Sequence, residues 1–122
     1  MYGARAAYNT VRATTNYGRD LEAAVLMRAA RDLKAVQDHW NDPGRLERLE
    51  DALRINQRVW SIFQAELADP AHPLPQKVRK DLLALGAFID KRILAVLASP
   101  APEKLDAIIN INLNIAAGLQ GA

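Results

Sequence analysis

His39 and His72 are the two histidines of this 122-residue chain, and histidine is the side chain most often used for proton transfer and metal ligation near neutral pH. Neither has a second ligand at the spacing of a zinc site, and neither is accompanied by the serine and acid of a catalytic triad. We therefore expect both histidines at the surface or at helix ends. The pattern predicts no metal ion, no cofactor and no catalytic site.

Carboxylates occur close together at Glu47 with Asp51 and at Asp20 with Glu22. Arginines flank both pairs, which is typical of solvated helix faces rather than of buried acid–base groups. The chain has no cysteine, and its six glycines are scattered without a phosphate-binding loop. These features favour a protein that binds another protein over an enzyme.

Two asparagines are more informative because they interrupt apolar helix faces. Asn56 lies between Leu53 and Trp60, and Asn112 lies shortly before Ile115. A buried amide without partners would cost about 1–3 kcal/mol, so each should be hydrogen-bonded. Two interpretations stay open: a polar bond in the core that fixes helix register, or a groove partly open to a partner helix whose backbone the amide pairs with.

Lys77, Arg79 and Lys80 form a basic group at the start of a helix-like segment, and the negative charge of Asp81 follows directly. The whole chain has 16 basic and 14 acidic residues, a net charge of +2. So small an excess favours a solvated face over a phosphate-binding surface. We do not expect this protein to bind nucleic acid directly.

Three proline-containing clusters, at 41–44, 69–75 and 99–102, divide the chain into long segments with helical apolar periodicity. We expect helices over about 19–40, 42–69, 75–98 and 102–119, and an additional short helix over 3–14 that presents Tyr8 and Val11. Asp42 should cap the second long helix, with Pro43 in its first turn. Gly86 interrupts the third, which indicates a close helix contact there.

The predicted fold is therefore all-α: a compact bundle of four long helices in one domain over 1–122. In the second helix Ala52, Ile55, Val59 and Ile62 widen the apolar stripe to about half the circumference. A compact bundle could bury all of this apolar surface, or the excess could form a groove for an amphipathic partner helix. Without an apolar signal region or a membrane-length apolar stretch, we expect a cytoplasmic protein that is not inserted in a membrane.

In its motifs the sequence resembles the bacterial flagellar protein family FlaF, over nearly the whole chain and least over 1–5. The resemblance depends on several segments in order: Ala7-Tyr8, LEAAVLMRAARDL within 19–33, ALRINQRVWSIFQAEL at 52–67, PLP at 73–75, LLALGAFIDKRILAVL at 82–97 and PEKLDAIININLNIAAGLQG at 102–121. Their combination carries the specificity, since single helical stripes are common.

The resemblance implies a cytoplasmic non-enzyme needed for flagellin production and export. Its implied partners are flagellin, the flagellar export apparatus and FlbT, a regulator that acts on flagellin mRNA. The implied mechanism is that of a secretion chaperone, which covers an amphipathic flagellin helix in an apolar groove and prevents premature self-assembly.

The resemblance also implies a set of partner-binding residues, without separating those that touch flagellin from those that hold the bundle together. Trp60 and Phe63 are favoured as anchors because large aromatic side chains dominate interface energies, although a small core would also bury them. The full set is Asn56, Trp60, Phe63, Leu82, Leu85, Phe88, Asp90, Leu105, Ile109, Asn112 and Ile115.

Two other functions stay open. The first is post-transcriptional regulation of flagellin expression, acting through FlbT or on RNA through basic side chains whose binding would weaken steeply with salt. The second is a self-assembling helical scaffold. The basic side chains in question are Arg19, Arg28, Arg31, Lys77, Arg79 and Lys80.

Overall fold

The computed structural model describes residues 4–121, and the side chains of residues 18–121. This part of the chain forms four α-helices and one short 3₁₀ helix, without β-strands, so the predicted all-α bundle is confirmed. The elements are α1 (Ala4–Asp38), α2 (Arg45–Ala68), α3 (Gln76–Ala98), the 3₁₀ helix η1 (Pro102–Leu105) and α4 (Asp106–Gly121).

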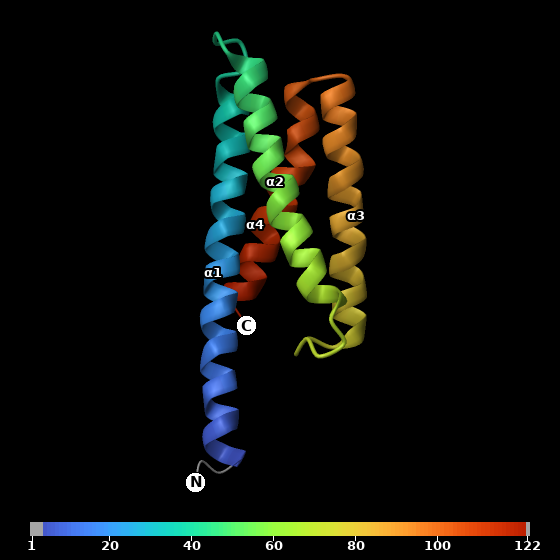
Figure 1. Cartoon of the computed structure of the whole chain (residues 1–122). Helices are drawn as coiled ribbons and strands as arrows, with labels where there is room; N and C mark the ends of the chain where they lie inside the picture. The colour runs from blue at the N-terminus through green and yellow to red at the C-terminus, as the bar shows by residue number, and fades with distance from the viewer. Residues whose placement is uncertain (1–3, 122) are drawn as a thin grey trace.

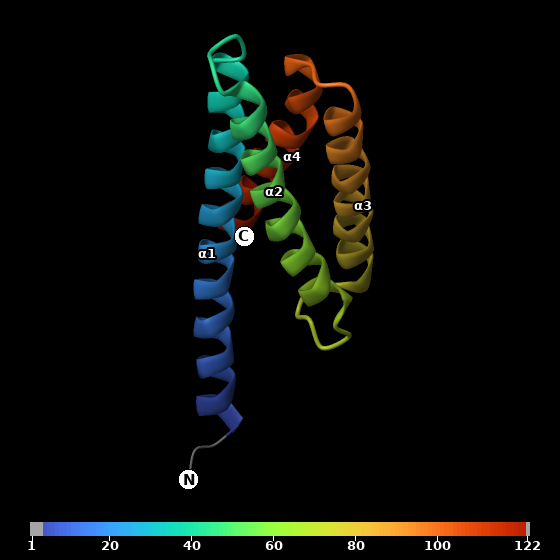
Figure 2. The same cartoon turned by 45° about the horizontal axis from the view of Figure 1, so that its top comes forward.

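The helices α1 and α2 form an antiparallel hairpin, and α3 lies beside α2 on the side away from α1 (Figure 1). The chain then returns behind α2, so that α4 packs mainly against α1. The tilted view shows the same order of α1, α2 and α3, with α4 behind them (Figure 2). One face of the α1–α2 hairpin is therefore covered by α4, and the opposite face is not.

The first helix is continuous from Ala4 to Asp38, so the prediction of a separate short helix near the N-terminus is wrong. No proline interrupts this stretch, and Gly18 costs only about 1 kcal/mol relative to alanine inside a helix. The early turns of α1 extend beyond the ends of the other helices (Figure 1). The side chains of Tyr8 and Val11, expected to be presented there, lie outside the described residues.

The turn before α2 differs from the predicted cap at Asp42. The N-cap is Gly44, whose φ of 77° is left-handed and favours glycine, and the helix begins at Arg45. Asp42 instead lies near His39, with 3.1 Å between its carboxylate and the imidazole Nδ1. The guanidinium of Arg48 closes the turn by donating to the carbonyl of Pro43 at 2.6 Å.

The last helix also begins differently, because 102–105 forms a 3₁₀ turn before regular α-helix starts at Asp106. The side-chain amide of Gln37, near the end of α1, donates to the carbonyl of Pro102 at 2.9 Å and to the carboxylate of Asp106 at 2.7 Å. These bonds attach the start of α4 to the end of α1.

Gly86 is buried where α3 crosses α2, and the expected close contact is confirmed. A Cβ at this position would lie 2.9 Å from both Cγ and Cδ of Gln64. A Cβ atom essentially never comes this close to a non-bonded atom, so a larger side chain at position 86 requires Gln64 to move.

We predict that the effect of Gly86→Ala on stability changes sign with the residue at position 64. With Gln64 present, overpacking should exceed the gain in helix propensity and lower the free energy of unfolding by about 1 kcal/mol. In a Gln64→Ala background the clashing atoms are gone, and the same change should raise it by up to about 1 kcal/mol. Urea unfolding of the four variants measures both effects, and equal effects in the two backgrounds would contradict the proposed contact.

Candidate partner-binding site

A chain of side-chain hydrogen bonds crosses the core between α2 and α4. The indole Nε1 of Trp60 donates to Oδ1 of Asn112 at 2.8 Å, and Nδ2 of Asn112 donates to Oδ1 of Asn56 at 2.5 Å. Nδ2 of Asn56 donates to the carbonyls of Ala52 at 2.9 Å and of Ala29, on α1, at 3.2 Å. We call this set of bonds the asparagine network; it joins α1, α2 and α4.

Both asparagines are fully buried, and every buried side-chain polar atom among the described residues has a hydrogen-bond partner. The expectation that Asn56 and Asn112 are hydrogen-bonded in the core is therefore confirmed, and their role in fixing helix register stays a prediction. The alternative, in which these amides face an open groove, is wrong for this structure because each amide is satisfied inside the bundle.

Most of the other residues that the resemblance implied as partner-binding also lie in the core, on the inner faces of the helices. The rings of Trp60 and Phe63 pack against each other, with centroids 5.6 Å apart. Phe88 is exposed, with the guanidinium of Arg92 5.3 Å from its ring centroid. The buried members are Asn56, Trp60, Phe63, Leu82, Leu105, Ile109 and Asn112, and the half-buried ones are Leu85, Asp90 and Ile115.

We predict that Asn112→Ala lowers the free energy of unfolding by about 3 kcal/mol, because the Trp60 indole N–H and the Asn56 carbonyl lose their partner and a cavity forms. Asn114→Ala, on the exposed side of the same helix, should change it by less than about 0.5 kcal/mol. Urea unfolding followed by tryptophan fluorescence compares them. Equal losses for the two variants would contradict a structural role for the network.

The uncovered face of the α1–α2 hairpin carries an apolar groove. A hollow of about 530 Å³ lies toward the turn between the helices, and one of about 210 Å³ lies toward the other end. Residues 25 and 32 of α1, residue 39 just after its end, and residues 55 and 62 of α2 recur at steps of seven, which places both hollows along the same face. We call this surface the α1–α2 groove.

Large apolar side chains are exposed along this groove, although side chains of their type are usually buried. Leu21 and Ile62 are 54% and 57% exposed, and Val25 and Ile55 are 40% and 44% exposed. The wide apolar stripe predicted for α2 indicated this surface, because its residues Ile55, Val59 and Ile62 line the groove. The contribution of Leu21 and Val25 was missed because α1 has no comparably distinct second stripe.

Two carboxyl groups face each other at one end of the α1–α2 groove, Glu22 from α1 and Glu66 from α2. Burial, followed by the hydrogen bond and the negative charge of Glu66, together raise the pKa of Glu22 from 4.5 to about 7. The positive charge of Arg19 opposes this shift. Near neutral pH, Glu22 therefore holds a proton for part of the time.

We predict that stability falls as the pH rises through the window between about 4.5 and about 7, because the folded chain retains the Glu22 proton that the unfolded chain loses. The stability that the Glu22 proton contributes is fully present below about pH 4.5 and is lost above about pH 7. Glu22→Gln keeps an amide donor for Glu66 and removes this titration, so its stability should depend less on pH. Urea unfolding from about pH 5 to about pH 8 measures the slope, with Glu50→Gln as control. Parallel slopes in all three proteins would contradict the assignment.

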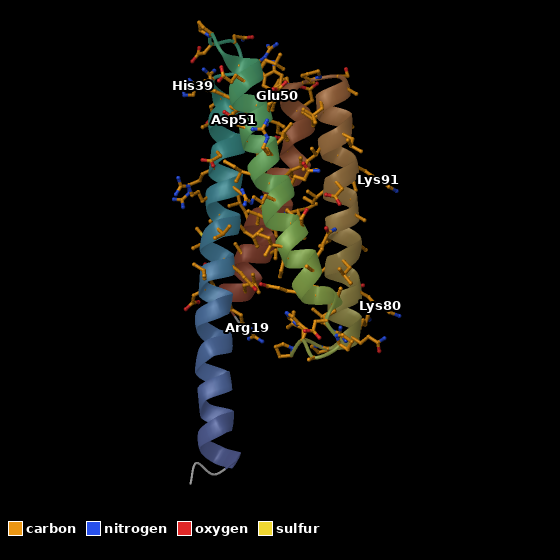
Figure 3. The ribbon with its side chains drawn as sticks, in the orientation of Figure 1. Arg19, His39, Glu50, Asp51, Lys80 and Lys91 are labelled. Atoms are coloured by element: carbon orange, nitrogen blue, oxygen red, sulfur yellow. The ribbon has the colours of Figure 1, made fainter. Side chains whose placement is uncertain are left out.

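Three of the basic side chains considered for RNA binding can be placed, and they come from different parts of the bundle (Figure 3). The guanidinium of Arg79 donates to the carbonyls of Leu67, Asp69 and Leu74, where it holds the turn before α3. Lys80 points outward from α3, whereas Arg19 extends from α1 (Figure 3).

The histidines lie where the sequence placed them, with His39 exposed just after α1 and His72 half-buried in the turn before α3. Burial lowers the pKa of His72, and the positive charge of Arg79 lowers it further. The Nδ1 atom of His72 accepts a hydrogen bond from the backbone N–H of Leu74 at 3.2 Å. Within residues 18–121, no three potential metal-ligating side chains cluster together.

The fold and this surface together describe a small helical protein with an exposed apolar groove on one helix pair. A family model described as flagellar protein FlaF matches residues 4–119, and the chain therefore belongs to the FlaF family. The resemblance inferred from the motifs is confirmed. No curated protein and no solved structure matches the chain. Among the described helices, none has both the length and the apolar character required to cross a membrane.

Proposed function

We propose that this FlaF-family protein binds flagellin in the cytoplasm, acts as its export chaperone and regulates its synthesis during flagellum assembly. Membership of a flagellar protein family supports the flagellar role. The observation that carries the binding proposal is the exposed apolar α1–α2 groove. In this proposal the groove covers an amphipathic flagellin helix that would otherwise self-assemble.

The dimensions of the groove suit such a helix. Its two hollows together extend from Leu21 in α1 to His39 just after that helix, which at about 1.5 Å per residue is a length of roughly 27 Å. Small side chains in its walls, Ala35 and Ala52, allow a helix to approach closely, while Val25 and Ile62 supply exposed apolar surface. Helix-in-groove binding uses apolar anchors spaced three, four and seven residues apart, and the groove offers apolar surface along its length.

This assignment moves the proposed contact from the core residues to the outer side of the hairpin. Phe63 is the one residue that belongs both to the set predicted from the sequence and to the lining of the groove, where it lies below Ile62 and Val59. The proposal therefore does not require the core to open. FlbT and the export apparatus would bind other surfaces of the chain or the chaperone complex itself.

We predict that Ile62→Ser weakens flagellin binding at least about tenfold, because the most exposed apolar side chain of the groove is replaced by a hydroxyl. The matched control is Leu94→Ser on α3, which removes a side chain of similar exposure, 65% against 57%, outside the groove. Isothermal titration calorimetry with purified monomeric flagellin measures both affinities. Since both side chains are exposed, both variants should fold.

Two outcomes would oppose the proposal in different ways. If the unaltered protein does not bind intact flagellin, or binds flagellin without its terminal helices equally well, the chaperone function is wrong. If Ile62→Ser and Leu94→Ser bind flagellin as the unaltered protein does, flagellin is bound elsewhere and the groove is not its site.

A further inference from the structure

The rim of the α1–α2 groove is acidic, although the chain as a whole has a net charge of +2. Glu22 and Glu66 lie at one end, and Asp32, Asp42 and Asp51 line the other hollow, where Asp42 lies 3.1 Å from His39 and Asp51 lies 3.4 Å from Arg54. The arginine that lines the groove, Arg48, is occupied in the turn between the helices, where it donates to backbone carbonyls. A ligand that fits the Glu22 and Glu66 end of this surface therefore has an apolar face with positive charge beside it.

The Glu22 and Glu66 pair is the most specific part of this rim. The two carboxyls come from opposite walls, within hydrogen-bonding reach of each other and next to the exposed side chains of Leu21 and Ile62. Among residues 18–121, neither carboxylate forms a salt bridge. The two acids are thus held together at an apolar surface without a cation between them.

The other charged groups around this pair do not supply that cation. Arg19 lies on the same helix and only partly offsets the negative charge. His72 lines a neighbouring hollow with Arg19 and Glu22, and its Nδ1 is already used as an acceptor for the Leu74 N–H. Asp69 adds negative charge near His72, and α4 contributes the uncharged Leu119 to this hollow.

We propose that the helix bound in the α1–α2 groove carries a lysine or arginine that inserts between the carboxylates of Glu22 and Glu66. The inference rests on the proposed function, since it describes the partner segment that the groove accepts. Insertion of the cation releases the proton that the two carboxyls share near neutral pH, so binding is coupled to proton release. The apolar floor supplies contact area, and the acidic pair fixes the register of the bound helix.

A second copy of this chain is a poorer occupant. In a symmetric dimer formed through the groove, each acidic rim would meet the acidic rim of the partner copy, because a two-fold interface pairs the same surface with itself. Like charges placed opposite each other at an interface are unfavourable. A basic amphipathic segment of a different protein has the complementary charge.

The test measures proton release when monomeric flagellin binds the full chain. Isothermal titration calorimetry at about pH 7 in phosphate and in Tris, which differ in ionisation enthalpy, gives the number of protons released. We expect about half a proton per complex, because the pKa of Glu22 lies at about 7. Affinity should be about tenfold higher at about pH 8 than at about pH 6, since protons compete with the cation.

Glu22→Gln is the decisive variant. The amide can still donate to Glu66, but it cannot release a proton, so proton release and the pH dependence of affinity should both disappear. At about pH 8 its affinity should be about tenfold lower, because the cation meets one carboxylate instead of two. Glu50→Gln, an acidic residue of α2 outside the groove, should behave like the unaltered protein. Flagellin's own titrating groups contribute equally to proton release with the unaltered protein and with Glu22→Gln, so the difference between the two proteins reports Glu22 alone.

Three results would overturn the inference. If flagellin binding is weakened by Ile62→Ser but not by Glu22→Gln, and proton release is unchanged in Glu22→Gln, the groove binds flagellin without the cation and the proposed function stands. If flagellin does not bind at all, the proposed function fails and the inference fails with it. If sedimentation shows a dimer of the chain that Ile62→Ser dissociates, a second copy occupies the groove.

Discussion

The asparagine network determines how α1, α2 and α4 meet. Apolar contacts between helices are nondirectional and tolerate small shifts, whereas a buried amide is stable only when its donors and acceptors find partners. A shift of α4 by one residue turns its side chains by about 100°, which would take Asn112 away from both Trp60 and Asn56. The network therefore selects one register among several with similar apolar burial, in the way that a single buried asparagine sets register in a coiled coil.

That register decides which face of the α1–α2 hairpin stays open. Because Asn112 is bonded to Asn56 and Trp60, α4 lies along the rear of the hairpin, and α3 occupies the far side of α2. The front face keeps exposed apolar side chains such as Leu21 and Ile62, which a fourth helix on that side would have buried. Contiguous exposed apolar surface on a small protein often marks a site of interaction. The groove is thus a consequence of the core, although the two share few residues.

Local sequence rules were sufficient for the helices and for the core. Helical periodicity and the proline clusters gave all four long helices, and the position of Asn56 and Asn112 on apolar stripes indicated their buried bonds. The errors at the ends of helices have local causes too. Gly44 caps α2 in place of Asp42 because the reversal needs a left-handed residue, and α1 continues through Gly18 because no proline stops it.

The candidate site was predictable only in part, because it depends on the relative placement of helices. Glu22 and Glu66 are 44 residues apart in the chain, and nothing in either local sequence indicates that their carboxyls meet. Each helix read alone suggests a solvated acid beside arginines. Likewise, periodicity separates inner from outer helix faces, but it does not say which outer face a further helix will cover. The prediction therefore favoured Trp60 and Phe63, as large aromatic side chains on an apolar stripe, rather than Leu21 and Val25.

The acidic pair also links the stability of the fold to binding. Placing Glu22 next to Glu66 at an apolar surface disfavours the ionised form of Glu22. Above about pH 7 both carboxyls are ionised, and their repulsion destabilises the folded state. A cation inserted between the carboxylates would remove the repulsion, so a groove occupied in this way would be more stable than an empty one. Part of the favourable free energy of binding would then come from relief of strain that already exists within the protein. Repulsion of this kind also opposes an uncharged apolar ligand, which gains contact area in the groove but leaves the two acids unpaired.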